Sequence, residues 1–290
     1  MAETLARVST HLLIPILFAV WLAHSTPRNR VEWAIDVWLF WSYCILIFLA
    51  GSWAEIAYPL RYLPPALLLA ATVWSGKRLR GLESVAIRAG RAVALSVLAV
   101  ALGFSALQAL LAQTPGDEPT VGLAFPLRDG TFHTIQGGRH PSVNRFAAVD
   151  SLRHAVEIGK MGRFGRNDPA ATPIVWSPCD GVVDEVRDSV VVLRCLGGAV
   201  DRGDGAALVR LWPLTALRVA EGDSVHAGLP LGRLSREEGG AGLRIAASRK
   251  EAPAPIRFGG YYLARNALFR APVADPRSES VGGSAPDSRQ

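Results

Sequence analysis

The residues of this 290-residue chain that could hold a metal ion lie in its C-terminal half. His140 and His154 flank Asp150 in sequence, and imidazole nitrogens and carboxylate oxygens are ligand types that zinc accepts. The histidines of this half show neither His-x-His nor His-x-x-x-His spacing, so the sequence does not favour a metal site. His140 and His154 are the only credible substitute ligands. His226, in a Gly-Asp hairpin segment, is expected to be exposed and structural.

Other chemistries find little support in the sequence. A serine nucleophile would need an elbow such as Gly-x-Ser-x-Gly, and none occurs. Gly203-Asp204-Gly205 does not stand between a strand and a helix with a lysine, so it is expected to be a loop and not a phosphate cradle. The net charge is +6, but the strongest basic cluster, at 77–91, lies between two apolar segments. That position favours a role in membrane topology over nucleic-acid binding.

Three cysteines occur, without a Cys-x-x-Cys motif, so neither a zinc knuckle nor a disulfide-dense scaffold is indicated. Cys179 and Cys195 lie symmetrically about the turn signal Arg187-Asp188. A hairpin there would bring them to opposite or diagonal positions on neighbouring strands, where a disulfide and two buried thiols both remain open. Cys44 falls inside an apolar segment and is expected to be a packing residue.

Short β-branched runs after residue 120 indicate the elements that position these groups. Turn signals such as Asp180-Gly181 separate them, which predicts an antiparallel all-β domain over 121–270. Residues 114–120 are expected to form a linker, and the polar segment 271–290 a disordered tail. The runs are 174–176, 181–186, 190–193, 207–211 and 243–246.

The N-terminal region, 1–113, is unusually apolar and contains six of the eight tryptophans. A membrane span needs about 20 apolar residues of helix, and aromatic residues favour the membrane interfaces. We therefore expect a multi-pass α-helical membrane region with about four transmembrane helices, in preference to a buried helical core or a cleaved signal peptide. The predicted segments are 10–24, 35–53, 58–74 and 92–112, of which the first and third are short and contain proline.

The distribution of basic residues predicts the orientation of these helices. Loops rich in lysine and arginine stay in the cytoplasm, so the 77–91 loop is expected inside. The last helix then delivers the C-terminal domain to the extracytoplasmic side of a bacterial inner or plasma membrane.

Several stretches of the C-terminal half resemble one protein family. The segment 178–183 (PCDGVV) looks like a strand entry of the form A-x-x-D-G-x-V. The segments 211–214 (LWPL), 219–225 (VAEGDSV) and 228–232 (GLPLG) are similar to "Y-A-H-L … V-x-x-G-D-x-V-x-x-G-x-x-I-G". In this order, with 136–138 and 144–150 upstream, they resemble the lysostaphin-type or LytM-like zinc metalloendopeptidases. The resemblance covers about residues 121–250 and implies a LytM-like β-domain of the duplicated-hybrid-motif type.

The resemblance also implies positions for a zinc site, and most of them carry unsuitable residues. The histidine and aspartate of the family's His-x-x-x-Asp segment fall at Phe146 and Asp150, and a catalytic histidine falls at Pro213. The His-x-His pair falls at Gly242 and Arg244. One carboxylate cannot hold a catalytic zinc, and a guanidinium has no lone pair to donate. If the alignment holds, Arg244 would pair with Asp150 and fill the old site.

These observations predict a membrane-anchored LytM-like domain that is catalytically inactive, with no catalytic residue and no metal. Such a domain is expected to bind peptidoglycan or a cell-envelope protein, or to regulate a cell-wall hydrolase. The alternative within the family is an active zinc endopeptidase with non-standard ligands, His140 and His154 being the candidates. A biotinyl or lipoyl carrier is a third reading, but it needs a hairpin lysine, and only Lys160 and Lys250 lie beyond the membrane half. A membrane-fusion adaptor would need coiled-coil heptads, which are absent from the sequence.

Overall fold

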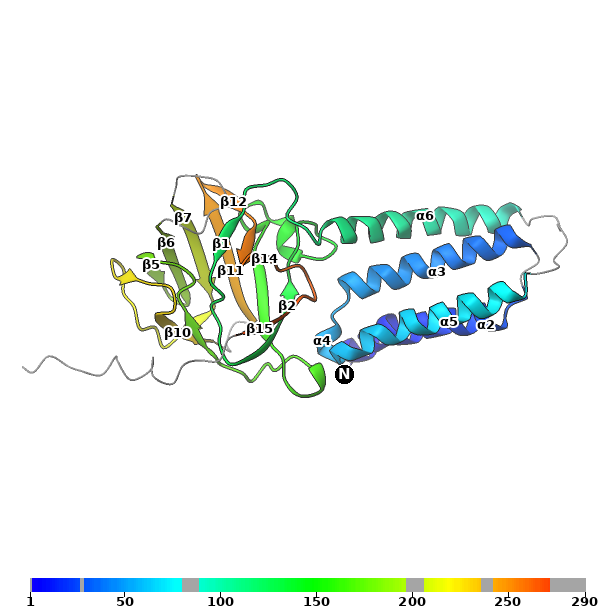
Figure 1. Cartoon of the computed structure of the whole chain (residues 1–290), viewed down its shortest axis with the longest axis horizontal. Helices are drawn as coiled ribbons and strands as arrows, with labels where there is room; N and C mark the ends of the chain where they lie inside the picture. The colour runs from blue at the N-terminus through cyan, green and yellow to red at the C-terminus, as the bar shows by residue number, and fades with distance from the viewer. Residues whose placement is uncertain (1, 27–28, 80–88, 197–205, 236–241, 272–290) are drawn as a thin grey trace, which may run out of the picture.

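The structure is a computed structural model that describes residues 2–26, 29–79, 89–196, 206–235 and 242–271. Helices occupy the N-terminal part and strands the C-terminal part (Figure 1). The predicted tail beyond Ala271, the Gly203–Gly205 loop and most of the basic 77–91 loop lie outside the described residues.

The N-terminal part is an elongated bundle whose helices run side by side toward the β domain (Figure 1). Helix α3 packs along α6, and α2 packs along α5. Among the described residues, three helices are long and apolar enough to cross a membrane, over Ala2–His24, Arg30–Ala50 and Gly90–Leu111. The elements are α1 (Ala2–Val8), the π-helical turn η1 (Ser9–Leu13), α2 (Ile14–His24), α3 (Arg30–Ala50), α4 (Trp53–Ile56), the 3₁₀-helix η2 (Tyr58–Tyr62), α5 (Leu63–Lys77) and α6 (Ala89–Leu111).

Of the four expected spanning segments, the third, 58–74, is not among the three long apolar helices found in the described residues. That segment divides into η2 and the 15-residue helix α5, which has proline in its first turn. Proline is tolerated in the first turn of an α-helix but removes a hydrogen bond and clashes inside one, so the α-helix begins at Leu63. Fifteen residues rise only about 22 Å, so α5 reaches the roughly 30 Å of a bilayer core only together with η2, which runs directly into it.

Large apolar side chains cover the outside of the bundle. Trp21, Trp38, Leu69, Val97 and Phe104 are each at least half exposed, whereas the buried core between the helices is small. Exposed apolar side chains in this number indicate that the outside of the bundle contacts another apolar phase.

The C-terminal part is a β domain built on one large twisted sheet with the strand order β15-β2-β3-β11-β7-β6-β5-β9, with β12 on β11. Two three-stranded sheets, β4-β10-β8 and β1-β13-β14, complete it, and all described pairs are antiparallel except β1 with β13. The strands are β1 (Val121–Leu123), β2 (Gly130–Gln136), β3 (Val156–Lys160), β4 (Ile174–Trp176), β5 (Gly181–Arg187), β6 (Val190–Cys195), β7 (Ala207–Trp212), β8 (Leu214–Thr215), β9 (Ser224–Val225), β10 (Pro230–Leu234), β11 (Gly242–Arg249), β12 (Ala252–Ala254), β13 (Ile256–Phe258), β14 (Tyr261–Tyr262) and β15 (Leu268–Ala271).

Alternation along the strands explains the core of this domain. In β7, Ala207, Val209 and Leu211 are buried, whereas Leu208 and Arg210 point outward, as the period of two in a strand requires. The five predicted runs all lie in strands, and four of those strands are longer than the runs by one to four residues.

The predicted hairpin joins β5 and β6 through a turn in which Asp188 adopts a positive φ of 50°. Gly181 pairs with Cys195, so Cys179 lies just before the strand on a diagonal. The structure joins Cys179 and Cys195 in a disulfide with a Cα–Cα distance of 5.7 Å, within the ordinary range. Cys44 is a buried free thiol in the bundle core.

Candidate functional site

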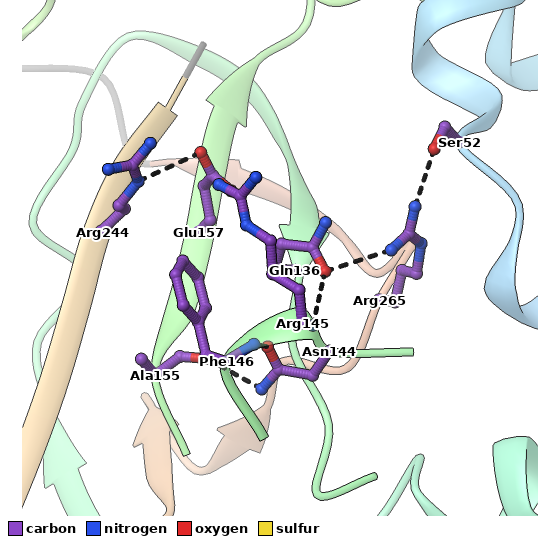
Figure 2. A network of polar contacts seen from close by, with 9 residues as sticks. All are labelled: Ser52, Gln136, Asn144, Arg145, Phe146, Ala155, Glu157, Arg244 and Arg265. Atoms are coloured by element: carbon purple, nitrogen blue, oxygen red, sulfur yellow. Dashed lines mark hydrogen bonds and ion pairs between the residues drawn. The ribbon is translucent and has the colours of Figure 1, made fainter. Parts of the chain in front are cut away.

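A buried carboxylate held between two arginines is the most unusual feature of the β domain (Figure 2). Glu157, the second residue of β3, is 2% exposed. Its Oε2 accepts a bond of 2.9 Å from Nη2 of Arg145, and its Oε1 accepts one of 3.4 Å from Nε of Arg244. Arg244 lies directly opposite Glu157 because β11 pairs with β3 in that register. These three residues are called the Glu157 cluster below.

The backbone around Arg145 is fixed by two amide side chains. Arg145 begins the 3₁₀-helix η3 (Arg145–Ala148), whose N-cap Asn144 accepts a bond of 3.1 Å from the amide of Phe146. The Asn144 amide also donates to the carbonyls of Gly138 and Ala155, at 2.8 and 3.0 Å. Capping satisfies donors that the helix start would leave unpaired, so η3 presents Arg145 to Glu157 in one orientation.

Gln136 joins the Glu157 cluster to the end of the helical bundle. Its Oε1 accepts bonds of 3.1 Å from the Arg145 amide and from Nη1 of Arg265. Nη2 of Arg265 donates in turn to Oγ of Ser52, which follows α3, at 2.7 Å (Figure 2). A chain of polar contacts therefore runs from β11 through β3 and β2 to the bundle.

Of the residues that the sequence singled out as former metal-site positions, Arg244 belongs to the Glu157 cluster. Phe146 is buried in η3, with the Arg145 guanidinium 5.1 Å from its ring centroid. Asp150 is exposed and begins the 3₁₀-helix η4 (Asp150–Leu152). Pro213 is buried between β7 and β8, and Gly242 is the buried first residue of β11.

The expected ion pair between Arg244 and Asp150 is wrong, because the structure pairs Arg244 with Glu157. The sequence alignment placed the carboxylate seven residues too early, in a segment that forms 3₁₀ turns and not the strand beside β11. One signal could have indicated Glu157: it is the only charged residue in a four-residue run of β3 that is otherwise apolar or glycine. Arg145, Gln136 and Arg265 carried no comparable signal.

The histidines proposed as substitute ligands have other partners. His140 Nδ1 lies 2.9 Å from Oγ of Ser142, and buried His154 pairs through Nε2 with Oε2 of Glu118 at 2.7 Å. His226 is exposed. In the part of the chain that the structure describes, no three His, Cys, Asp or Glu side chains are grouped to hold a metal ion.

Zinc, the ion that the resemblance implies, does not fit the Glu157 cluster. A zinc site needs about three lone-pair donors, and here the carboxylate is contacted by two guanidinium groups, which have none. Both carboxylate oxygens already accept charge-assisted bonds. Chemically, the cluster is an ion-pair network of one buried carboxylate and two guanidinium groups, with a net positive charge.

The β domain is attached to the bundle by a second set of contacts around Asn266. Its side-chain amide donates to the carbonyls of Leu49 and Gly51, at 3.0 and 2.9 Å, at the end of α3. Its own carbonyl accepts a bond of 2.9 Å from the Tyr58 hydroxyl and one from buried Arg61, whose guanidinium also stacks on an aromatic ring of α3. Asn266 has φ 63°, a left-handed conformation that asparagine tolerates better than most residues.

A cavity of about 1070 Å³ lies between the bundle end and the β domain. The start of α1, the segment 52–56, strand β2, the segment 162–169 and Arg265–Asn266 line it, and Arg145 and Glu157 reach it from the cluster.

One wall residue of this cavity, His133 on β2, predicts how stability depends on pH. It is 3% exposed, and burial is the main reason that its pKa falls from 6.5 to about 4, with nearby Arg265 adding to the effect. Between these two values the unfolded chain binds a proton that the folded chain does not, so stability falls as the pH decreases from about 6.5 to 4. The shift corresponds to about 3 kcal/mol at most.

We expect the His133→Gln variant to lose less thermal stability than the original protein between pH 7 and 4.5, because glutamine takes up no proton. The measurement is the unfolding midpoint of the full chain in detergent as a function of pH. His226→Gln is the matched control, since His226 is exposed, and its pH profile should follow that of the original protein. Parallel profiles for all three proteins would contradict the role of His133.

Comparisons with known proteins give little further information. No family model and no curated protein matches the chain. A solved structure described as "A Novel M23 Metalloprotease Pseudoalterin from Deep-sea" is similar to part of it, with a TM-score of 0.35 and 12% sequence identity, over 52% of this chain and 98% of that chain. A similarity this low leaves the function to be argued from the residues themselves.

Proposed function

We propose that this protein is a membrane-anchored, extracytoplasmic LytM-like domain without peptidase activity, which binds peptidoglycan or regulates a cell-wall hydrolase. The observation that carries the proposal is Glu157, buried between Arg145 and Arg244. In the resemblance described above, Arg244 stands at a zinc-ligand position, and the strand register places Glu157 directly opposite it. We therefore infer that the cluster occupies the place of the family's metal site.

The loss of chemistry follows from the donor set. A metallopeptidase uses its metal to activate a water molecule and to polarise the scissile carbonyl. Two guanidinium groups at the site repel a divalent cation and leave no carboxylate oxygen free for it. The framework of strands does not depend on the metal, because apolar side chains from β3, β6, β7 and β11 fill the core.

Membrane anchoring and orientation are supported by the bundle. Three helices have the length and composition of spans, and the bundle exposes large apolar side chains. Helix α3 begins and α5 ends at the end of the bundle away from the β domain (Figure 1). Arg30, Lys77 and Arg78 lie at these helix ends, so the preference of basic residues for the cytoplasm puts the β domain outside.

The test of the proposed function uses the full chain purified in detergent. We expect substoichiometric zinc by elemental analysis, no release of peptides from isolated peptidoglycan, and retention of the protein on insoluble peptidoglycan. A reporter fused after Gln113 should report an extracytoplasmic location. Two alanine variants form a matched pair. Arg244→Ala, in the Glu157 cluster, should lower the stability of the protein, and Asp150→Ala, at an exposed position, should leave it unchanged.

Stoichiometric zinc together with hydrolysis that is lost in His140→Ala or His154→Ala would overturn this proposal in favour of an active endopeptidase with non-standard ligands. A cytoplasmic reporter signal would refute the orientation. Failure of the protein to sediment with peptidoglycan would refute direct binding to peptidoglycan. Regulation of a cell-wall hydrolase would then require that the protein binds that hydrolase.

A further inference from the structure

The loop that follows β3 contains the most exposed large apolar side chain among the described residues. Phe164 lies in the 3₁₀ segment η5 (Arg163–Gly165) and is 81% exposed, and exposed Arg163 and Arg166 flank it. Residues 161–168 are called the Phe164 loop below. A single exposed phenylalanine needs no explanation by itself, so the backbone, the position and the charges of the loop decide what it does.

The backbone of the Phe164 loop keeps the aromatic ring from packing on the protein. Phe164 has a positive φ of 58°, a left-handed conformation that is an outlier for a bulky residue. Two backbone hydrogen bonds close the loop, from the amide of Gly162 to the carbonyl of Arg166 at 2.7 Å and from the amide of Arg166 to the carbonyl of Arg163 at 3.2 Å. Backbone strain of this kind persists only where the surrounding structure enforces it, and it is concentrated at functional positions.

The Phe164 loop is fastened to the end of the helical bundle. A Cβ placed on Gly165 would lie 2.8 Å from Cδ of Pro59, so the backbone of the loop touches η2. The amide of Asn167 donates to the carbonyl of Ala54 at 2.6 Å. In Figure 1 this green loop lies beside α4, at the end of the bundle that meets the β domain. Its position relative to the helices is therefore fixed.

The same end of the bundle sets the level of the loop relative to a membrane. The candidate span Arg30–Ala50 ends just before α4, and the span Ala2–His24 begins at this end, where α1 packs against α4. Where these helices cross a bilayer, the loop lies at the boundary between headgroups and acyl chains. Tyr62, at the end of η2, is 56% exposed and is of the residue type that aromatic belts place at that boundary.

The charges of the Phe164 loop suit an anionic lipid surface. Arg163 and Arg166 are exposed, and within the described ranges no ion pair involves either of them. Neighbouring carboxylates have other partners, since Asp168 accepts a backbone hydrogen bond and Glu55 pairs with an arginine of α1. The Arg163 guanidinium lies 5.8 Å from the centroid of the Phe164 ring, so a cation and an apolar ring are presented together.

We propose that the Phe164 loop is a second membrane-contact site, in which Phe164 inserts below the headgroups of an anionic leaflet and Arg163 and Arg166 bind lipid phosphate groups. Burial of an aromatic ring at this boundary is favourable, and flanking cations add attraction to anionic lipid. The guanidinium fork matches two phosphate oxygens. This contact rests on the membrane anchoring in the proposed function, and not on peptidoglycan binding or on the loss of zinc chemistry.

The first experiment measures the depth of the loop in lipid nanodiscs that contain the full chain. Phe164→Cys is labelled with the fluorophore NBD in a Cys44→Ala background, which removes the free thiol. The nanodiscs consist of phosphatidylglycerol and phosphatidylcholine in equal parts. A phosphatidylcholine with a nitroxide on its acyl chain should quench the label strongly, and aqueous iodide should quench it weakly. Replacing Arg163 and Arg166 with glutamine should shift the loop about tenfold or more toward the iodide-exposed state, because two cations are lost.

A second experiment uses the unlabelled protein, because the fluorophore is itself apolar. Trypsin cleaves after arginine, so insertion of the loop should protect Arg163 and Arg166 in the same nanodiscs. Phe164→Asn should be cleaved there about tenfold faster, because it removes the apolar ring. Asparagine tolerates the left-handed backbone at this position, so the shape of the loop is kept.

Two further labelled positions separate the loop contact from the membrane anchoring. Val97→Cys, exposed on α6 within a candidate span, should be quenched by the lipid nitroxide. Glu221→Cys should be quenched by iodide, because Glu221 is exposed in the turn before β9, at the sheet edge opposite β15 and β2.

Lipid quenching of the Val97 label without quenching of the label at 164 would refute the loop contact and leave the anchoring intact. If the lipid nitroxide quenches neither label, the anchoring and the loop contact both fail. Equal trypsin cleavage of the original protein and Phe164→Asn would also contradict the contact, whatever the label reports. If the labelled Phe164→Cys protein does not fold, the trypsin experiment decides the outcome.

Discussion

Replacing Glu157 with alanine is expected to destabilise the β domain by about 3–5 kcal/mol, which corresponds to a fall of roughly 10 °C in its unfolding midpoint. The carboxylate is 2% exposed, and both of its oxygens accept bonds from guanidinium groups. Its removal leaves Arg145 and Arg244 facing one another, with Arg244 largely buried. Mutual repulsion and the lost solvation of an unpaired charge then act in the same direction. The measurement is thermal unfolding of the full chain in detergent.

Two further variants make this expectation specific. Glu221→Ala removes an exposed glutamate from the Gly-Asp turn and should change the midpoint by no more than about 1–2 °C. The triple variant Arg145→Met, Glu157→Leu, Arg244→Met should recover most of the loss, because replacing a whole buried ion-pair network by apolar side chains is often neutral or stabilising. If the Glu157→Ala protein unfolds at the same midpoint as Glu221→Ala, the Glu157 cluster does not contribute to the stability of the β domain.

Replacing Asn266 with glycine is expected to weaken the attachment of the β domain to the bundle by about 2–3 kcal/mol. The change deletes the two hydrogen bonds that the Asn266 amide donates to the carbonyls of Leu49 and Gly51. These two carbonyl oxygens then lose their side-chain donor. Glycine is chosen because it accepts the left-handed backbone at this position without strain. Detachment should expose the segment 53–58, where Trp53, Ala54 and Tyr58 are buried, so the rate at which a limiting protease cleaves this segment should rise by roughly 30-fold or more.

The matched control for this experiment is Lys250→Gly. Lys250 also has a positive φ, 46°, but its side chain is exposed in the turn between β11 and β12. Its cleavage rate should equal that of the original protein. Equal cleavage rates for Asn266→Gly and Lys250→Gly would mean that other contacts, such as Arg265 with Ser52, hold the two parts together.

Much of the architecture could be predicted from local patterns in the sequence. Long apolar runs predicted helices that could cross a membrane, and short β-branched runs between turn residues predicted five segments that lie in strands. The symmetric spacing of Cys179 and Cys195 about a turn was enough to bring them within bonding distance. These features depend on residues close together in the chain, so their periodicity and composition are visible without the fold.

One local prediction was not confirmed, for a local reason. Segment 58–74 was counted as a spanning helix on its hydropathy, yet Pro64 and Pro65 can only begin an α-helix, which leaves α5 with 15 residues. Hydropathy describes which phase a segment prefers, and proline decides where its helix starts.

The candidate site was decided by the tertiary structure. Arg145, Glu157 and Arg244 are separated by up to 99 positions in the sequence, and only the pairing of β3 with β11 sets Glu157 opposite Arg244. A sequence alignment chose Asp150 as the carboxylate because it had suitable chemistry near the expected spacing. Strand register changes the partner of every residue when it slips by one position, and it is fixed by the packing of the whole core.

The seam between bundle and β domain was equally invisible in the sequence. Asn266 and Arg265 are ordinary polar residues in their local contexts, and their importance comes from contacts with Tyr58, Ser52 and the end of α3, 208 to 215 residues away in the chain. By itself the sequence determined which segments are apolar helices and which are strands, since those preferences are local. Which charges are buried together was decided only when the fold removed water from between distant segments.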